Sequence, residues 1–117
     1  MELIHSSAVN ILNYKNLNYF LKDLYEQKKS TDPLFSFEVW ASQLQFKSRS
    51  MVRMAITGRI KITMTFVNRL SESLKLSEAQ KNYFILLVNH HNTKIEFLKS
   101  TYFDKMIEMA SFIEDDT

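Results

Sequence analysis

The segment from Lys47 to Lys61, KSRSMVRMAITGRIK, brings together side chains that bind anions. It contains five of the fifteen Lys and Arg residues of the chain and no acidic residue. Arg can form paired hydrogen bonds with a phosphate or with a guanine base, and the hydroxyls of Ser48, Ser50 and Thr57 can bond to either. The segment is therefore suited to binding a polyanion, and the alternative is that it forms an ordinary solvated helix face.

The charge of the whole chain is unevenly distributed along its sequence. No acidic residue occurs between Glu38 and Glu72, and that interval carries six Lys and Arg residues. The other nine basic and thirteen acidic residues leave a net charge of −4, although the whole chain has a formal charge of +2. Because charges act mainly within about 10 Å at ordinary salt concentrations, this local excess says more about partners than the total does.

Other kinds of chemistry find little support in the sequence. There is no Cys, which excludes disulfides, thiolate metal ligands and a cysteine nucleophile. His90 and His91 are adjacent, and neighbouring residues on a helix point about 100° apart, so the pair is unsuited to chelating a metal. We find no Gly-rich phosphate loop and no arrangement typical of a catalytic triad. We therefore expect no metal, no cofactor and no enzymatic activity.

The composition predicts a single all-α domain. A chain of 117 residues is long enough for one hydrophobic core and too short for two domains. One Gly and one Pro leave few residues for the tight turns that β-hairpins need. The N-terminus lacks the basic region and long apolar run of a signal peptide, and no window is apolar over the roughly 20 residues that span a bilayer. We expect a cytoplasmic protein without a membrane segment.

Hydrophobic spacing and capping residues predict a compact bundle of about six helices after an N-terminal arm at residues 1–13. Polar residues that favour helix N-caps precede five of the expected helices, namely Asn16, Ser36, Ser48, Thr63 and Ser77. The sixth helix, expected at residues 94–113, has apolar residues at spacings of three and four: Ile95, Leu98, Tyr102, Met106, Met109 and Ile113.

The third helix, expected at residues 48–57, has one apolar face and one basic face. Val52, Ala55 and Ile56 recur at helical spacing and should be buried with Met51. The opposite face carries Arg49, Ser50, Arg53 and Thr57. Gly58 stands where a left-handed residue commonly ends a helix. Two short helices with a tight turn between them, the second basic, are typical of a helix-turn-helix, whose recognition helix enters the major groove of DNA.

The stretch from Trp40 to Leu76 resembles the Xre/Cro, lambda-repressor-like DNA-binding domains. The resemblance rests on the pair Trp40-Ala41, on Phe46 after the turn, on Gly58, and on the segment VNRLSESLKL, which is similar to the next helix of that fold. It implies a lambda-repressor-like helix-turn-helix. Gln45 occupies the turn position where Gly is usual, so the turn must either accept a non-Gly residue or take another form.

A second resemblance covers roughly residues 11–105. The segments YKNLNYFLKDLYEQKK, FSFEVWASQLQF, GRIKIT and KNYFILLVNHHNTK are similar to the N-terminal half of an uncharacterised bacterial family of transcriptional regulators. Both resemblances imply that the protein regulates transcription by binding double-stranded DNA, whether sequence-specifically or as an architectural protein. They assign DNA contacts to Lys47, Ser48, Arg49, Ser50, Arg53, Thr57, Arg59 and Lys61, with Arg69 as a further flanking residue.

Two questions about partners stay open at the level of sequence. A homodimer would duplicate the few base pairs that one short helix can read, and the helix at residues 94–113 is a candidate dimerisation element. The alternative is that this helix only packs within its own chain. The helix-turn-helix could also serve as a protein-protein interaction module without DNA binding, with its basic face against an acidic protein and with Met54 partly exposed as an adaptable contact.

Overall fold

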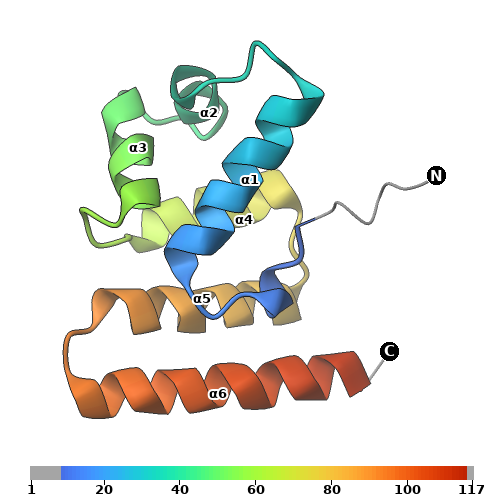
Figure 1. Ribbon diagram of the computed structural model, residues 1–117, viewed down its shortest axis with the longest axis vertical. Coiled ribbons are helices and arrows are strands. Elements are labelled where there is room, and N and C mark those ends of the chain that lie inside the picture. Colours follow the sequence, from blue (N-terminus) through green and yellow to red (C-terminus); the bar gives the residue numbers. More distant parts are fainter. Residues whose placement is uncertain (1–8, 116–117) are drawn as a thin grey trace.

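The computed structural model describes residues 9–115, and within that range the chain is all-helical without β-strands. A short 3-10 helix, η2 (Ile11–Asn13), precedes six α-helices. These are α1 (Leu17–Thr31), α2 (Phe37–Gln43), α3 (Arg49–Thr57), α4 (Met64–Leu74), α5 (Glu78–Asn92) and α6 (Glu96–Asp115) (Figure 1). The prediction of an all-α chain with six helices is confirmed.

Each of the five predicted N-caps begins a helix. The side-chain oxygens of Asn16, Ser36, Ser48, Thr63 and Ser77 accept hydrogen bonds from backbone N–H groups in the first turns of α1 to α5. At α5 the bond is reciprocal, because the Gln80 side chain accepts from the backbone N–H of Ser77 at 2.9 Å while Gln80 N–H donates to Ser77 Oγ at 3.1 Å. These local bonds satisfy N–H groups that have no partner inside the helix.

The hydrophobic core draws on every helix. Its largest fully buried side chains include Trp40, Tyr83, Phe20, Phe66 and Phe84. Burying such side chains is the main favourable contribution to folding, at about 25 cal/mol per Å² of apolar surface. The predicted N-terminal arm is only partly described, since residues 1–8 lie outside the described range. Ile11 and Leu12, which belong to that predicted arm, are buried in the core through η2.

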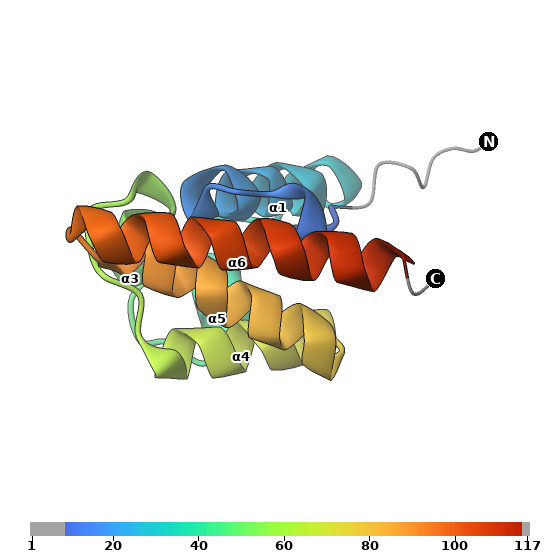
Figure 2. The ribbon, with the colours of Figure 1, turned by 90° about the horizontal axis from the view of Figure 1, so that it is seen from below.

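The last two helices lie side by side in antiparallel directions (Figures 1 and 2). Met106 is buried, and Leu98, Tyr102, Met109 and Ile113 are partly buried, so most of the predicted apolar seam does face the protein. Ile95 differs: its side chain is 59% exposed, because α6 begins only at Glu96 and Ile95 lies in the connecting turn.

None of the helices within residues 9–115 combines the length and the apolar character that crossing a lipid bilayer would require.

Candidate nucleic-acid interface

The connection between α2 and α3 is a tight turn held by one arginine. Helix α2 ends at Gln43, and Gln45 adopts the left-handed conformation with φ of 64°. The Arg69 guanidinium donates to the carbonyl oxygen of Gln45 at 2.8 Å and lies over the Phe46 ring, 4.8 Å from its centroid. The turn therefore accepts a non-Gly residue. Arg69, expected as a flanking phosphate contact, is bonded to the turn and positions it.

Helix α3 has the two faces that its sequence predicts. Val52, Ala55 and Ile56 are buried, whereas Met51, also expected in the core, is only partly buried; the side chain of Met54 is 37% exposed. The exposed residues include every predicted contact on the helix and its flanks, namely Lys47, Ser48, Arg49, Ser50, Arg53, Thr57, Arg59 and Lys61. The structure therefore brings all eight to the surface on one continuous segment.

The exposed residues differ in how far they are already engaged. Ser48 Oγ accepts from the backbone N–H of Ser50 at 3.1 Å, so its hydroxyl caps the helix. Thr57 Oγ1 donates to the carbonyl of Arg53 at 3.0 Å. The five cationic side chains have no hydrogen bond or ion pair with any other described residue: Lys47, Arg49, Arg53, Arg59 and Lys61. Their charges are therefore left available to a partner.

Gly58 ends α3 in the left-handed conformation, with φ of 77°, as predicted. The Asn18 side chain of α1 donates to the carbonyl oxygens of Ala55 and Ile56 at 3.1 and 3.0 Å. The Ala55 carbonyl also accepts from the backbone N–H of Gly58 at 3.3 Å, so the Asn18 amide supplements the cap there and supplies a donor to the Ile56 carbonyl. The end of α3 is thereby fixed to α1.

The loop after α3 is fixed to the end of α5. The Asn92 side chain accepts from the backbone N–H of Ile62 at 2.9 Å and donates to its carbonyl oxygen at 2.8 Å. His91 Nε2 lies 3.4 Å from the carbonyl oxygen of Ile60. Since Arg59 and Lys61 alternate with these residues along the loop, the paired contacts hold the basic loop in place. Sequence reasoning missed Asn18 and Asn92, because neither residue belongs to a local motif.

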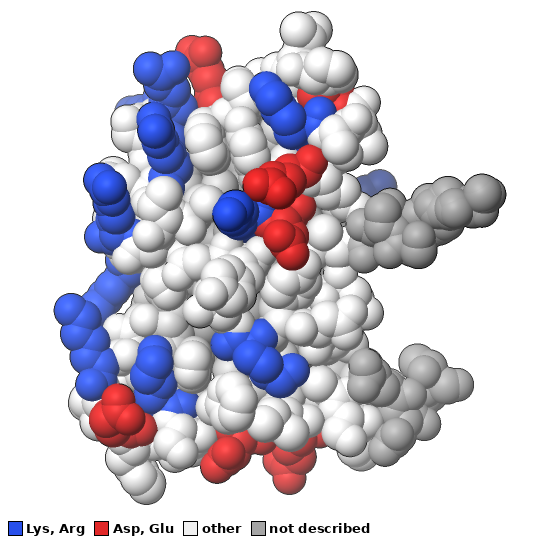
Figure 3. All heavy atoms as spheres, in the orientation of Figure 1, with Lys and Arg blue, Asp and Glu red and all other residues white. Residues whose placement is uncertain are grey.

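The basic side chains follow one edge of the molecule. In Figure 3, Lys and Arg atoms succeed one another down the left edge, from α3 at the top to the α5–α6 turn at the bottom. Beside this row, acidic atoms appear only near its two ends; the other acidic atoms of this face lie away from it. The basic residues thus lie along one strip of the surface, which we call the basic strip. Charges arranged in this way attract anions more strongly than scattered charges would.

A small hollow borders the basic face of α3. It has a volume of about 330 Å³ and is lined by Arg49, Ser50 and Arg53 on one side. On the other side, the rings of Tyr25 and Phe37 are stacked with centroids 4.3 Å apart. Ser36 and Glu38 also line it, so the two arginines border a recess in which one carboxylate partly offsets their positive charge.

The two histidines at the end of α5, His90 and His91, are partly buried. The His90 ring lies 6.0 Å from the ring of Phe103 on α6, and Lys99 Nζ donates to the His90 carbonyl oxygen at 2.7 Å. Burial lowers the pKa of His90, and the positive charges of Lys99 and His91 lower it further. Within the described residues, no three His, Asp or Glu side chains are grouped so that they could hold a metal ion.

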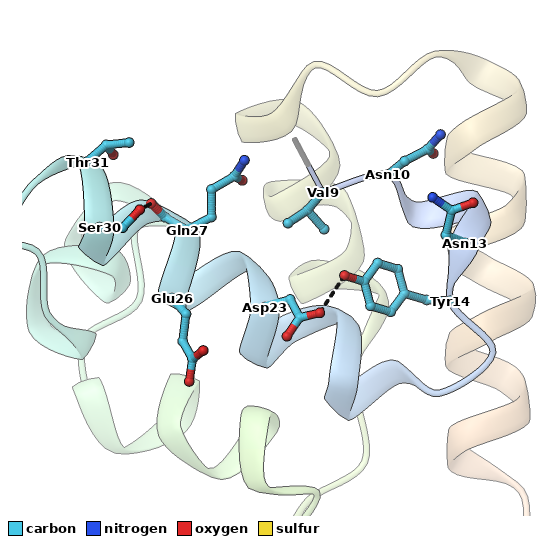
Figure 4. Close-up of a pocket in the computed structure, with 9 residues that line it drawn as sticks. All are labelled: Val9, Asn10, Asn13, Tyr14, Asp23, Glu26, Gln27, Ser30 and Thr31. Atoms are coloured by element: carbon cyan, nitrogen blue, oxygen red, sulfur yellow. Dashed lines mark hydrogen bonds between the residues drawn. The ribbon is translucent and has the colours of Figure 1, made fainter. Parts of the chain in front are cut away.

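A second hollow, of about 450 Å³, lies between η2 and α1 (Figure 4). Asp23 and Glu26 contribute carboxylates from α1, and Tyr14 Oη donates to Asp23 Oδ2 at 2.6 Å. Burial and this hydrogen-bonded carboxylate raise the pKa of Tyr14 to about 12. Among the described residues that line this hollow there is no Lys or Arg, so its acidic character is opposite to that of the α3 surface.

Comparison with protein-family models, curated proteins and solved structures found nothing that matches this chain.

Proposed function

We propose that this protein binds double-stranded DNA and regulates transcription, with α2 and α3 acting as a lambda-repressor-like helix-turn-helix and α3 lying in the major groove. The observation that carries the proposal is the row of five cationic side chains on α3 and its flanks that are not paired with any described residue, on a segment whose opposite face is buried. A rigid helix with one basic face suits the groove, which admits an α-helix and lies between two rows of phosphates.

The residues divide into two roles by their position on the helix. Arg49, Ser50 and Arg53 occupy the exposed face of α3, so we assign them to base edges. Lys47 precedes the helix, and Arg59 and Lys61 follow it, so we assign these three to phosphates on either side. Ser48 and Thr57 form hydrogen bonds within α3 and its cap, so we place them at the two ends of the DNA contact. The backbone N–H groups of the first turn, near Ser48, can also donate to a phosphate.

The proposal is tested by fluorescence anisotropy with duplex DNA of mixed sequence over a series of salt concentrations. We expect binding that weakens steeply with salt, with a log–log slope of about −0.9 for each phosphate neutralised. The double variant Arg49→Ala/Arg53→Ala should lose most of the affinity. Lys22→Ala/Lys75→Ala removes two exposed charges, from α1 and from the C-cap of α4, and is the matched control, which should bind as the wild type does. Absence of wild-type binding at low salt would contradict the proposal.

We further propose that the regulator acts as a homodimer through α6. The support is an apolar groove of about 580 Å³ between α5 and α6, lined in part by Ile85, Leu86, Met109 and Phe112, with the Phe112 side chain 72% exposed. A two-fold pair of such grooves would bury the exposed aromatic rings and duplicate α3 for two half-sites.

Light scattering coupled to size-exclusion chromatography tests the homodimer. We expect a dimer for the wild type and a monomer for Phe112→Glu. Phe97→Glu is the control, since Phe97 is also on α6 and is 77% exposed but does not line the groove. A wild-type mass equal to the 13.9 kDa chain at every concentration would refute this part of the proposal.

The competing function is a protein-protein interaction module that uses the same basic face against an acidic protein. The exposed side chains of Met54 on α3 and Met64 on α4 favour it, at 37% and 52% exposure, since methionines adapt to varied protein surfaces. The two functions predict different results for the variant Met54→Ala. This variant should leave salt-dependent DNA binding intact if α3 reads DNA, and should weaken binding to an acidic partner protein if α3 is a protein interface.

A further inference from the structure

The basic strip continues beyond α3 and its loop onto a part of the fold outside the helix-turn-helix. The α5–α6 turn lies on the same edge of the molecule as α3, with the α3–α4 loop between them (Figure 1). Lys and Arg atoms occupy this edge down to that turn (Figure 3). The long axis of the molecule, which is vertical in these views, measures 40 Å, comparable to one turn of B-DNA at about 34 Å.

The turn is joined to the basic loop by direct hydrogen bonds. Asn92 at the end of α5 holds both backbone polar groups of Ile62, and the Ile62 side chain is buried at 5% exposure. Lys61 is the neighbour of Ile62, and Lys94 lies two residues after Asn92. The paired bonds therefore set the chain segments that carry the two lysines against each other, although they are far apart in sequence.

The side chains at the turn are predominantly cationic. Lys94 is exposed and bonds to no other described residue, so its ammonium group is available. Lys99 adds a second positive charge, fixed at the His90 carbonyl. From Ala79 to Ile95 the sequence contains no acidic residue, and Glu96 in the first turn of α6 is the nearest carboxylate along the chain.

We propose that the α5–α6 turn is a second phosphate-binding element, in which Lys94 contacts the DNA backbone beyond the phosphates bound by the α3–α4 loop. The inference rests on the proposed DNA-binding function and extends its contact surface. Lys94 carries no base-reading role, because it lies off the recognition helix. It adds affinity for any duplex sequence and steepens the salt dependence.

Salt titrations of three proteins by fluorescence anisotropy test this extension: the wild type, Lys94→Ala and Lys22→Ala. All three would be measured on the same mixed-sequence duplex. Lys22 is an exposed lysine of α1, outside both the α3–α4 loop and the α5–α6 turn. Both variants lose the same charge, and both side chains are exposed, so a folding defect is not expected in either.

We expect Lys94→Ala to reduce the magnitude of the log–log salt slope by about 0.9 and to weaken binding about five- to tenfold at 0.1 M salt. Lys22→Ala should coincide with the wild type. The inference is overturned if Lys94→Ala also coincides with the wild type, or if Lys22→Ala loses as much slope, because net charge alone would then explain the effect. If the wild type does not bind DNA, the proposed function itself fails and this extension falls with it. Wild-type binding with an unchanged Lys94→Ala slope overturns only the extension.

Discussion

The side-chain amide of Asn18 occupies the space beside Gly58 that a larger residue would need. A Cβ on residue 58 would stand 3.0 Å from Asn18 Oδ1, and the same amide donates to the carbonyl oxygens of Ala55 and Ile56. Glycine, which occurs once in the chain, is therefore favoured at residue 58 for two reasons: its φ is 77°, and the Asn18 side chain leaves little room for a Cβ. Both requirements serve the same purpose, which is to end α3 and fix it to α1.

This relationship predicts that Gly58→Ala destabilises the protein by about 1–2 kcal/mol or more, because an L side chain in the left-handed region is strained. Asn18→Ala should cost a similar amount, because the Ile56 carbonyl loses its donor and the Ala55 carbonyl keeps only the Gly58 N–H. Urea unfolding of the double variant measures the coupling. We expect it to be less destabilised than the sum of the single variants, because Asn18→Ala removes the close contact. Strict additivity would show that the contact has no energetic consequence.

The α2–α3 turn predicts a stabilising substitution. Gln45 holds a φ of 64°, which Gly adopts without the steric penalty of a side chain. We expect Gln45→Gly to raise the free energy of unfolding by up to about 1 kcal/mol, since the relief of about 1–2 kcal/mol is partly offset by the entropy of Gly in the unfolded chain. Gln43→Gly, at the last residue of α2 and two positions before Gln45, should instead lower it, by up to about 1 kcal/mol. If both glycines destabilise equally, the left-handed conformation at Gln45 carries no strain.

The bond between Asn92 and Ile62 predicts a local effect on the basic loop. Asn92→Ala leaves the backbone N–H and carbonyl of Ile62 without partners, at an expected cost of about 1–3 kcal/mol. Hydrogen exchange should show faster exchange of the Ile62 amide in the variant. Asn82→Ala, at an exposed position of the same helix, is the control and should leave that amide protected. Unchanged protection of Ile62 in Asn92→Ala would mean that other contacts hold the loop.

His90 predicts a dependence of stability on pH. Its folded pKa lies below the usual value of 6.5, chiefly because of burial and then because of Lys99 and His91. The unfolded chain therefore takes up this proton first as the pH falls, so stability is fully present above 6.5 and is lost as the pH falls through the folded pKa. His90→Gln should flatten the pH dependence of the unfolding free energy in that window. A titration of the His90 ring by NMR at or above 6.5 would contradict the assignment.

The contacts made within a few residues of sequence were open to prediction. Asn16, Ser36, Ser48, Thr63 and Ser77 cap the helices as expected, because an N-cap bonds to N–H groups only two or three residues away. Helical periodicity likewise identified the buried face of α3 and the exposed positions of Arg49 and Arg53. The location of Gly58 at a helix end followed from the same local rules.

Other features depended on contacts between distant residues. Arg69 bonds to a turn 24 residues away, Asn92 to a loop 30 residues away, and Asn18 to a helix end 37 residues away. No spacing rule connects such pairs, because their proximity results from how the whole core packs. Amphipathic periodicity and capping thus determined the helices and the exposed charges from sequence alone. Only the tertiary structure decided that Arg69 supports the turn and that Lys94 lies on the same edge as α3, since packing brings together side chains that the chain keeps apart.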